Sequence, residues 1–304
     1  MSIKKLAAVL AASVISATAV TVTAFAAGTK VPITEKYFPD ENFREYVSEN
    51  FDTDGNGYLS QKERDAVTEI DVYNMEIKSL KGLQYFKNLA LLFCDHNELT
   101  KLDINQNTKL EEINCYANNL TSLNVSKNTE LEALDCEANK LTSLDVSKNT
   151  KLEYLNCANN QLTRIDVSKN FKLEHFRCDW NKITKLDISK NTKLEMLNCD
   201  ANKLTSLDVG KNTKLKALIC AANKLTSLDV SKNTKLEELD FADNKLTEID
   251  LSKNVKLQQI WCDGNQLTSL DLSGCSELYY YFCDENVKVT ESEEYKDRKG
   301  TEVF

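Results

Sequence analysis

The sequence has few of the residues that catalysis and flexible linkers require. Its 304 residues include two His, eight Gly and two Pro. Neither His96 nor His175 has a nucleophile at a motif spacing, and neither a Gly-x-Ser-x-Gly turn nor a phosphate-binding loop occurs. We therefore expect a binding protein rather than an enzyme, without a flexible linker between domains.

An excess of positive charge is also missing. The formal net charge is −9, whereas a nucleic-acid partner or an acidic lipid surface selects for a basic stripe. The composition therefore argues against both partners. We expect the mature chain to act as a monomer.

Long apolar runs are confined to the start of the chain. Lys4 and Lys5 precede an apolar stretch from Leu6 to about Phe25, and a small-x-small site follows at residues 24–26. This pattern predicts a cleaved export signal over residues 1–26, with an uncleaved membrane anchor as the alternative. We expect no transmembrane span in the mature protein, which would be secreted or associated with the extracellular surface.

What the sequence has in abundance is repetition with a step of 21 residues. Leucines recur from Leu89 to Leu278, cysteines from Cys94 to Cys283 with Phe241 in one place, and asparagines from Asn97 to Asn286. A period this short predicts one coil per repeat, stacked into a solenoid. Each coil holds two segments in which inward and outward residues alternate, so we predict short parallel strands along two walls.

Nine of the ten cysteines fall on one inward row and are predicted to be buried free thiols. Neighbouring parallel strands lie about 4.8 Å apart, whereas bridged Cβ atoms lie about 3.8 Å apart. Metal binding is disfavoured because the row has no Cys-x-x-Cys pair and no adjacent histidine. Cys275 replaces an asparagine of the other repeats, and we predict that it lies in a surface turn as an exposed thiol.

The unit L-x-x-L-x-C-x-x-N-x-L-x-x-L-D-V-x-x-N resembles the bacterial leucine-rich repeat family, in its class with 21-residue nested repeats. The resemblance covers about 220 residues. It implies a curved solenoid over residues 67–286, with a parallel β-sheet on the concave wall and short extended segments opposite. It also implies that the concave wall binds protein. Residues 287–304 then form a C-terminal cap or tail.

Outward positions of the first half-coil differ from repeat to repeat, while those of the second half repeat Ser-x-Asp-x-Ser almost unchanged. Aromatic and Arg side chains on a rigid sheet are typical of interface cores. We predict a protein-binding wall, with a glycan- or cell-wall-binding adhesin as the alternative use of it. The predicted binding residues are Phe93, Tyr116, Tyr154, His175, Arg177, Trp180, Met196, Trp261, Tyr280 and Phe282. The constant Asp row opposite is predicted to keep the solenoid soluble, with a calcium-binding row as the less favoured alternative.

Residues 27–66 differ from the repeats and are predicted to form a small helical cap. A helix is expected from Glu41, with Phe43, Val47 and Phe51 on one face. Residues 52–63 then match the calcium-loop pattern D-x-[DN]-x-[DN]-G-x5-E. The expected ligands are Asp52, Asp54, Asn56, the Tyr58 carbonyl, Ser60 and Glu63. The loop resembles a single EF-hand, and the cap is similar to those of internalins, so calcium is the expected cofactor.

Overall fold

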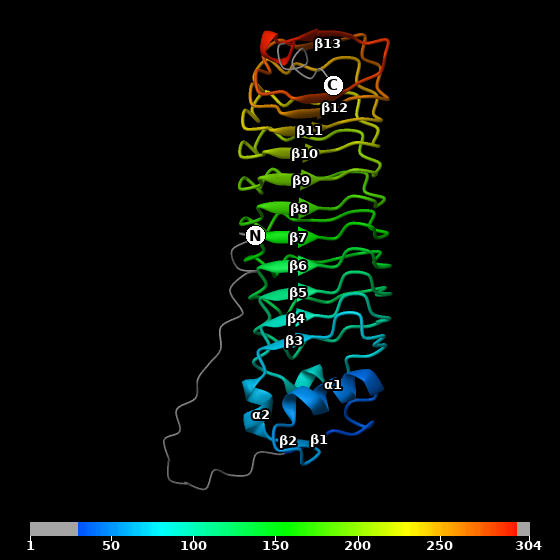
Figure 1. Cartoon of the computed structure of the whole chain (residues 1–304), viewed down its shortest axis with the longest axis vertical. Coiled ribbons are helices and arrows are strands. Elements are labelled where there is room, and N and C mark those ends of the chain that lie inside the picture. Colours follow the sequence, from blue (N-terminus) through cyan, green and yellow to red (C-terminus); the bar gives the residue numbers. More distant parts are fainter. Residues whose placement is uncertain (1–29, 297–304) are drawn as a thin grey trace, which may run out of the picture.

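The computed structural model describes residues 30–296, and the predicted export signal lies outside these residues. The chain forms a small helical cap followed by a solenoid of stacked coils (Figure 1). This confirms the predicted fold class. Among the described residues, no helix has the length and apolar character needed to span a bilayer.

The cap contains two helices and a two-stranded antiparallel pair. Helix α1 (Glu41–Phe51) begins after Asp40, whose carboxylate accepts the Phe43 N–H at 3.1 Å. Helix α2 (Gln61–Ala66) begins with a capping box between Ser60 and Glu63. Strand β1 (Val31–Pro32) pairs with β2 (Tyr58–Leu59). As predicted, Phe43 and Val47 are buried on one face of α1.

The cap joins the solenoid through a close aromatic contact. The ring of Phe51 lies 5.3 Å from that of Phe86, centroid to centroid, just after the 3-10 turn η1 (Leu83–Tyr85). Gly82 has φ +125°, and a Cβ there would clash with the Phe38 ring. The first coil therefore packs directly against apolar residues of the cap.

One wall of the solenoid is an 11-stranded parallel sheet (Figure 1). Partners across it are 21 residues apart, as in Leu134↔Leu155, so the sequence period becomes the sheet register. The strands, in spatial order from the cap, are β3 (Glu69–Asp71), β4 (Leu91–Phe93), β5 (Glu112–Asn114), β6 (Ala133–Asp135), β7 (Tyr154–Asn156), β8 (His175–Arg177), β9 (Met196–Asn198), β10 (Ala217–Ile219), β11 (Glu238–Asp240), β12 (Gln259–Trp261) and β14 (Tyr280–Phe282).

The cysteine row lies inside the solenoid as free thiols, as predicted, and only Cys283 of this row is partly exposed. Four of these thiols, including that of Cys136, donate to a carbonyl of the next coil; Cys136 Sγ lies 3.4 Å from the Asn156 carbonyl oxygen. The prediction for Cys275 was wrong. This residue is buried, 1% exposed, because the asparagine corner that it replaces faces the core rather than solvent.

Two asparagine ladders line the interior at the corners of the coils. In the first, Asn181 Nδ2 donates to the carbonyls of Cys157 and Cys178, at 3.0 and 3.1 Å, and its Oδ1 accepts the Leu162 N–H at 2.8 Å. In the second ladder, which includes Asn191, each amide nitrogen donates to carbonyls of the preceding coil. Each ladder therefore links neighbouring coils, as its inward position predicts.

The opposite wall, called here the back wall, comprises the outward residues of the second half-coils, such as Ser143, Asp145 and Ser147. A sheet along this wall was predicted, and this was wrong for most of its length. Within residues 67–296 it holds one strand pair, β13 (Ser269–Leu272) with β15 (Lys288–Glu291). The physical reason is local: Asp145 Oδ1 accepts the Ser147 N–H at 2.9 Å, so this N–H is used within its own coil.

Candidate binding wall and calcium loop

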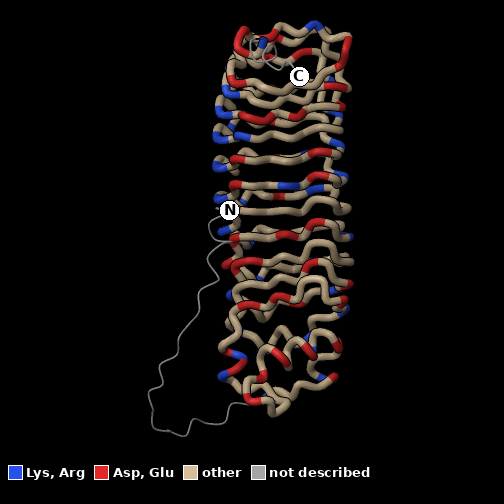
Figure 2. Tube along the Cα trace, viewed as in Figure 1, with Lys and Arg blue, Asp and Glu red and all other residues tan. Residues whose placement is uncertain are grey.

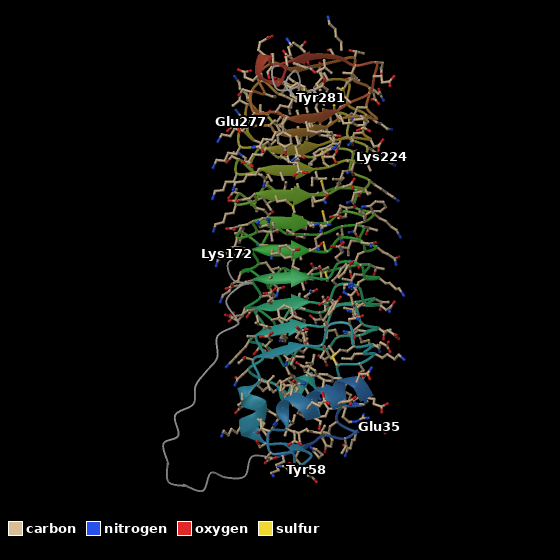
Figure 3. All side chains as sticks on the ribbon, in the orientation of Figure 1. Glu35, Tyr58, Lys172, Lys224, Glu277 and Tyr281 are labelled. Atoms are coloured by element: carbon tan, nitrogen blue, oxygen red, sulfur yellow. The ribbon has the colours of Figure 1, made fainter. Side chains whose placement is uncertain are left out.

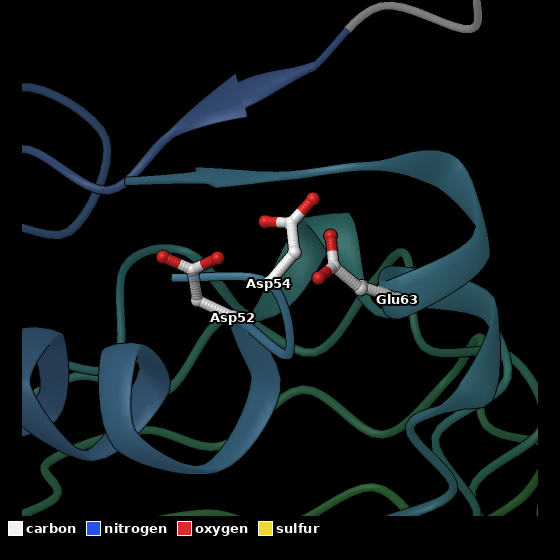
Figure 4. Close-up of side chains that lie close together, drawn as sticks. All are labelled: Asp52, Asp54 and Glu63. Atoms are coloured by element: carbon white, nitrogen blue, oxygen red, sulfur yellow. The ribbon is translucent and has the colours of Figure 1, made fainter. Parts of the chain in front are cut away.

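The predicted calcium loop places three carboxylates together at the base of the cap. Asp52 follows α1, Asp54 lies in the turn, and Glu63 projects from α2 (Figure 4). One carboxylate oxygen from each of the three residues lies within 4.8 Å of the other two. Gly55 and Gly57 have φ +67° and +78°, the left-handed conformation that lets the chain turn around this point.

Backbone N–H groups of the loop already hold these carboxylates in place. The Gly57 N–H donates to Asp52 Oδ2 at 2.8 Å, and the Thr53 N–H donates to Glu63 Oε1 at 2.8 Å. Burial raises the pKa of Glu63, but hydrogen bonds from Ser60 and Thr53 outweigh it and lower the pKa to about 2. Glu63 is therefore ionised at any physiological pH, as a calcium ligand must be.

The donor set fits a hard divalent cation. Carboxylate oxygens of Asp52, Asp54 and Glu63 converge, and the oxygen-only chemistry is what calcium prefers. Strand β2, inside the loop, pairs with β1, and the Ile33 N–H donates to the Gly57 carbonyl at 3.0 Å. The two-residue strand β1 had no recognisable signal in the sequence. By pairing with β2, this strand stabilises the loop from outside residues 52–63.

All ten predicted binding residues lie on the outward face of the 11-stranded sheet or at the turn beside it. We call this face the sheet wall: the outward residues of β4–β12 and β14 together with the next outward residues of the same coils. None of the ten is buried. The fold thus brings them to one surface, in three groups along its length.

The first group lies near the cap. His96 stacks edge-on between Tyr73 and Tyr116, with ring centroids 5.2 and 4.9 Å away. Tyr73, 55% exposed, was missed in the sequence because it precedes the regular ladders. Phe93 of β4 is the register partner of Asn114 in the adjacent strand β5.

Side chains of the central group contact charged neighbours within the wall, which the sequence did not indicate. Arg177 forms ion pairs with Glu137 at 3.4 Å and with Asp179 at 3.2 Å. The hydroxyl of Tyr154 lies 3.4 Å from a carboxylate oxygen of Asp135. Tyr154, His175 and Met196 are successive partners across β7, β8 and β9. Arg177 therefore neutralises acidic neighbours rather than standing as an unpaired cation.

The third group lies at the far end of the sheet wall. Trp261 and Tyr280 have ring centroids 5.5 Å apart, and Trp261 pairs in register with Phe282. Phe282 is 51% exposed. Trp180, between this group and the cap, is 64% exposed and has φ +51° at the turn after its strand. Large apolar surface is thus spread along the sheet wall instead of being covered by the chain.

Charge is distributed differently on the edges and on the walls. Lys and Arg gather where the coils turn (Figure 2), and Lys172 and Lys224 mark the two edges (Figure 3). On the sheet wall, by contrast, carboxylates outnumber cations beyond Arg177. The aromatic residues at these outward positions were predicted from the sequence. The surplus of carboxylates was not predicted, although they occupy the same positions of the repeat.

The stacked coils, the parallel sheet and the inward Leu, Cys and Asn rows give the chain the leucine-rich repeat fold. Residues 234–274 match the family model described as leucine-rich repeats in two copies. More particularly, the chain is internalin-like. It is 40% identical over 72 residues to Internalin J of Listeria monocytogenes serotype 4b and equally to that of serovar 1/2a.

Solved structures extend the likeness to most of the chain. The functional domain of InlJ from Listeria monocytogenes, described as including a cysteine ladder, aligns with 37% identity and a TM-score of 0.79. The alignment covers 88% of this chain and 64% of that one. A leucine-rich repeat protein of Leptospira interrogans, 22% identical over 79% of this chain and 66% of that one, shares the fold with a TM-score of 0.70.

The curated relatives are much longer than the region that matches them. The aligned 72 residues make up 24% of this chain and 8% of Internalin J. The sequence likeness to these relatives therefore extends over a small part of either protein.

Proposed function

We propose that this protein is an exported scaffold that recognises a protein partner through the sheet wall, with a structural calcium ion in its cap. The observation that carries the proposal is the contrast between the walls. The back wall repeats one polar pattern, whereas the sheet wall varies from coil to coil and exposes aromatic side chains. Varied aromatics on a rigid surface are typical of interface cores.

The recognition step can be tested by removing exposed aromatics together. Substitution of Trp180, Trp261 and Phe282 by Ala should abolish capture of the partner in a pull-down from extracellular material. Trp180 and Phe282 are exposed and Trp261 is only partly buried on the outward face, so their removal leaves the core intact. The matched control replaces Ser143, Ser227 and Ser269 on the back wall by Ala and should retain capture.

A glycan array run with the same three proteins separates the two kinds of ligand. Protein capture that depends on the aromatic residues, without glycan binding, supports the proposal. Glycan binding lost in the aromatic variant supports the adhesin instead. Equal capture by both variants would show that the sheet wall is not the site.

Calcium would be held by Asp52, Asp54 and Glu63, with Asn56, Ser60 and the Tyr58 carbonyl completing the oxygen set. Bound there, it would tie α1 to α2 and so fix the cap on the first coil. A lone loop of this kind suits extracellular affinities of about 10⁻⁴–10⁻³ M. At 10 mM calcium and a Kd of about 1 mM, the stabilisation would be about 1.4 kcal/mol.

Thermal melts with and without 10 mM calcium test this part of the proposal. We expect the wild-type melting temperature to rise by roughly 2–4 °C and the rise to vanish in Glu63→Gln. Glu49→Gln, an exposed carboxylate of α1 outside the loop, should keep the full rise. Absence of calorimetric heat at millimolar calcium in the wild type would exclude the site.

A further inference from the structure

The half of the sheet wall farther from the cap is acidic and holds no cation at its outward positions. This surface, called here the acidic half-wall, comprises the outward residues of the five coils from β9 to β14. No Lys, Arg or His occupies the two outward positions of each strand or the two that follow on the same face. The carboxylates there are Asp200, Glu238, Asp240, Asp243, Asp263, Asp284 and Glu285.

None of these carboxylates forms an ion pair with a Lys or Arg in the described part of the chain. The nearby Lys216 is engaged elsewhere, with Glu195 at 2.8 Å. Their hydrogen bonds come from backbone N–H groups, such as that of Ala242 to Asp240 at 3.1 Å. In the central group, by contrast, Arg177 pairs with two carboxylates. The negative charge of the acidic half-wall is thus uncompensated by the chain.

The side chains next to these partly buried carboxylates are small. The coil of β10 presents Ala217, Ala221 and Ala222 between the coils that carry Asp200 and Asp240. Burial raises the pKa of Asp240 to about 6, and the charges of Asp200 and Asp263 add to the effect. A cation placed between these coils would relieve the repulsion among the three carboxylates.

Aromatic faces border the acidic surface at its far end. Trp261 and Tyr280 lie in contact, and Phe282 and Tyr280 are exposed on the same face. Guanidinium and ammonium groups are attracted to aromatic faces, and Arg more often than Lys. Carboxylates beside exposed aromatic rings therefore complement a side chain that is both planar and positively charged.

We propose that the acidic half-wall docks a cationic, Arg-bearing segment of the protein partner, laid across β9 to β14. Arg side chains of that segment would meet Asp200, Asp240 and Asp263 and would stack on Trp261 and Tyr280. This inference rests on the proposed function and specifies the chemistry of its partner. An acidic or purely apolar partner segment would leave these carboxylates buried without compensation, which is unfavourable.

Synthetic peptides of equal length with alternating Arg-Ser, Lys-Ser or Glu-Ser serve as probes, read by tryptophan fluorescence and titration calorimetry. We expect the Arg peptide to bind more tightly than the Lys peptide and the Glu peptide not to bind. The test variant carries Asp240→Asn, Asp243→Asn and Asp263→Asn, and should weaken Arg-peptide binding by about tenfold or more.

The matched control carries Asp208→Asn, Asp229→Asn and Asp250→Asn on the back wall and changes the net charge equally. Asn124 occupies the position equivalent to the three back-wall residues, and Asn156 and Asn159 those equivalent to Asp240 and Asp243; Asn124 and Asn156 accept the same backbone bonds. Asp263 is replaced by Ala at the equivalent positions 158 and 242, so both variants should fold. We expect the control to lose no more than about twofold, because exposed charges on the far wall are screened.

Three results would overturn the inference: equal losses in both triple variants, binding of the Glu peptide as tight as that of the Arg peptide, or no Arg-peptide binding by the wild type. Each is separable from failure of the proposed function. If the aromatic variant still abolishes partner capture while the Arg peptide does not bind, the sheet wall remains the site and its partner segment is not cationic.

Discussion

The inward thiols are buried, and those of Cys115, Cys136, Cys157 and Cys262 also donate a hydrogen bond to the next coil. Burial raises the pKa of Cys136 well above its ordinary value, with the neighbouring thiols adding to the shift. For Cys275, burial raises it to about 11. Since the thiolate is the reactive form, the buried thiols should be inert while the solenoid is folded.

A thiol titration should therefore distinguish Cys283 from all other cysteines. In native buffer we expect one group to react quickly with a disulfide reagent, and in denaturant all ten. Cys283→Ser should remove the native reaction. Fast reaction of several thiols in the native wild type would contradict the dry cysteine row.

The two asparagine ladders differ in how completely their amides are used. Asn181 both donates to two carbonyls of neighbouring turns and accepts the Leu162 N–H. Asn191 Nδ2 donates to Val167 and Asn170, but its Oδ1 has no hydrogen-bond partner among the described residues. Cys275 shows that a coil can omit the second amide altogether.

We predict that Asn181→Ala lowers the free energy of unfolding by about 1–3 kcal/mol, because it leaves a buried N–H and carbonyls unpaired. Asn191→Ala should cost less, since it also removes an unpaired buried oxygen. Denaturant midpoints of the two variants, measured side by side, test the order. A larger loss for Asn191→Ala would contradict this assignment of roles.

At the scale of the element, the turn after each strand uses a left-handed residue. The column with φ near +50° comprises His96, Ala117, Ala138, Asn159, Trp180, Ala201, Ala222 and Asp243, and Gly264 continues it at +67°. A side chain in this conformation costs about 1–2 kcal/mol, whereas glycine adopts it freely. Nearly every coil nevertheless has a residue other than glycine at this position.

Ala201→Gly and Ala222→Gly should therefore raise the free energy of unfolding, by up to about 1 kcal/mol after the entropy of glycine is subtracted. Gly264→Ala should lower it, because a Cβ there would clash with Asp243. Ala217→Gly, inside β10, is the control and should destabilise by roughly 0.5–1 kcal/mol. Destabilisation by Ala201→Gly as large as that of the control would contradict the argument.

Periodicity made the sheet wall predictable, because any residue in register with Leu134 or Cys136 must face inward and its neighbours outward. Features that depend on one local contact were not predictable. The Asp145 bond to Ser147 replaces a ladder on the back wall, β1 braces the calcium loop from a two-residue strand, and Cys275 enters the core through a corner that looks like a surface turn in the sequence.

For the whole molecule, the two walls shift their carboxylates in opposite directions. On the sheet wall, burial raises the pKa of Asp135, Asp179, Asp200 and Asp263, and raises that of Asp240 to about 6. On the back wall, backbone N–H donors of Ser residues lower the pKa of Asp145, Asp166 and Asp229. The solenoid therefore carries two acidic surfaces with opposite responses to pH.

The sign of each response follows from linkage. A carboxylate whose pKa is raised by folding binds protons more tightly in the native state, so stability increases as pH falls through about 6 toward 3.8, the ordinary value for Asp. A carboxylate whose pKa is lowered stabilises the fold above its ordinary value and loses this contribution as pH falls further. Glu63, with a pKa of about 2, belongs to the second kind.

We therefore expect maximal thermal stability at mildly acidic pH, with a rise between pH 7.5 and about 5 and a fall below about 4. Asp240→Asn should stabilise the protein at pH 7.5 and reduce the rise on acidification, because it removes one of the crowded charges next to Asp200 and Asp263. Asp229→Asn on the back wall should leave that rise unchanged, since its pKa is lowered and lies below this pH range. Melting temperatures that fall steadily from pH 7.5 to 5 in the wild type would show that the sheet-wall carboxylates are compensated in solution, and would remove the electrostatic basis for a cationic partner.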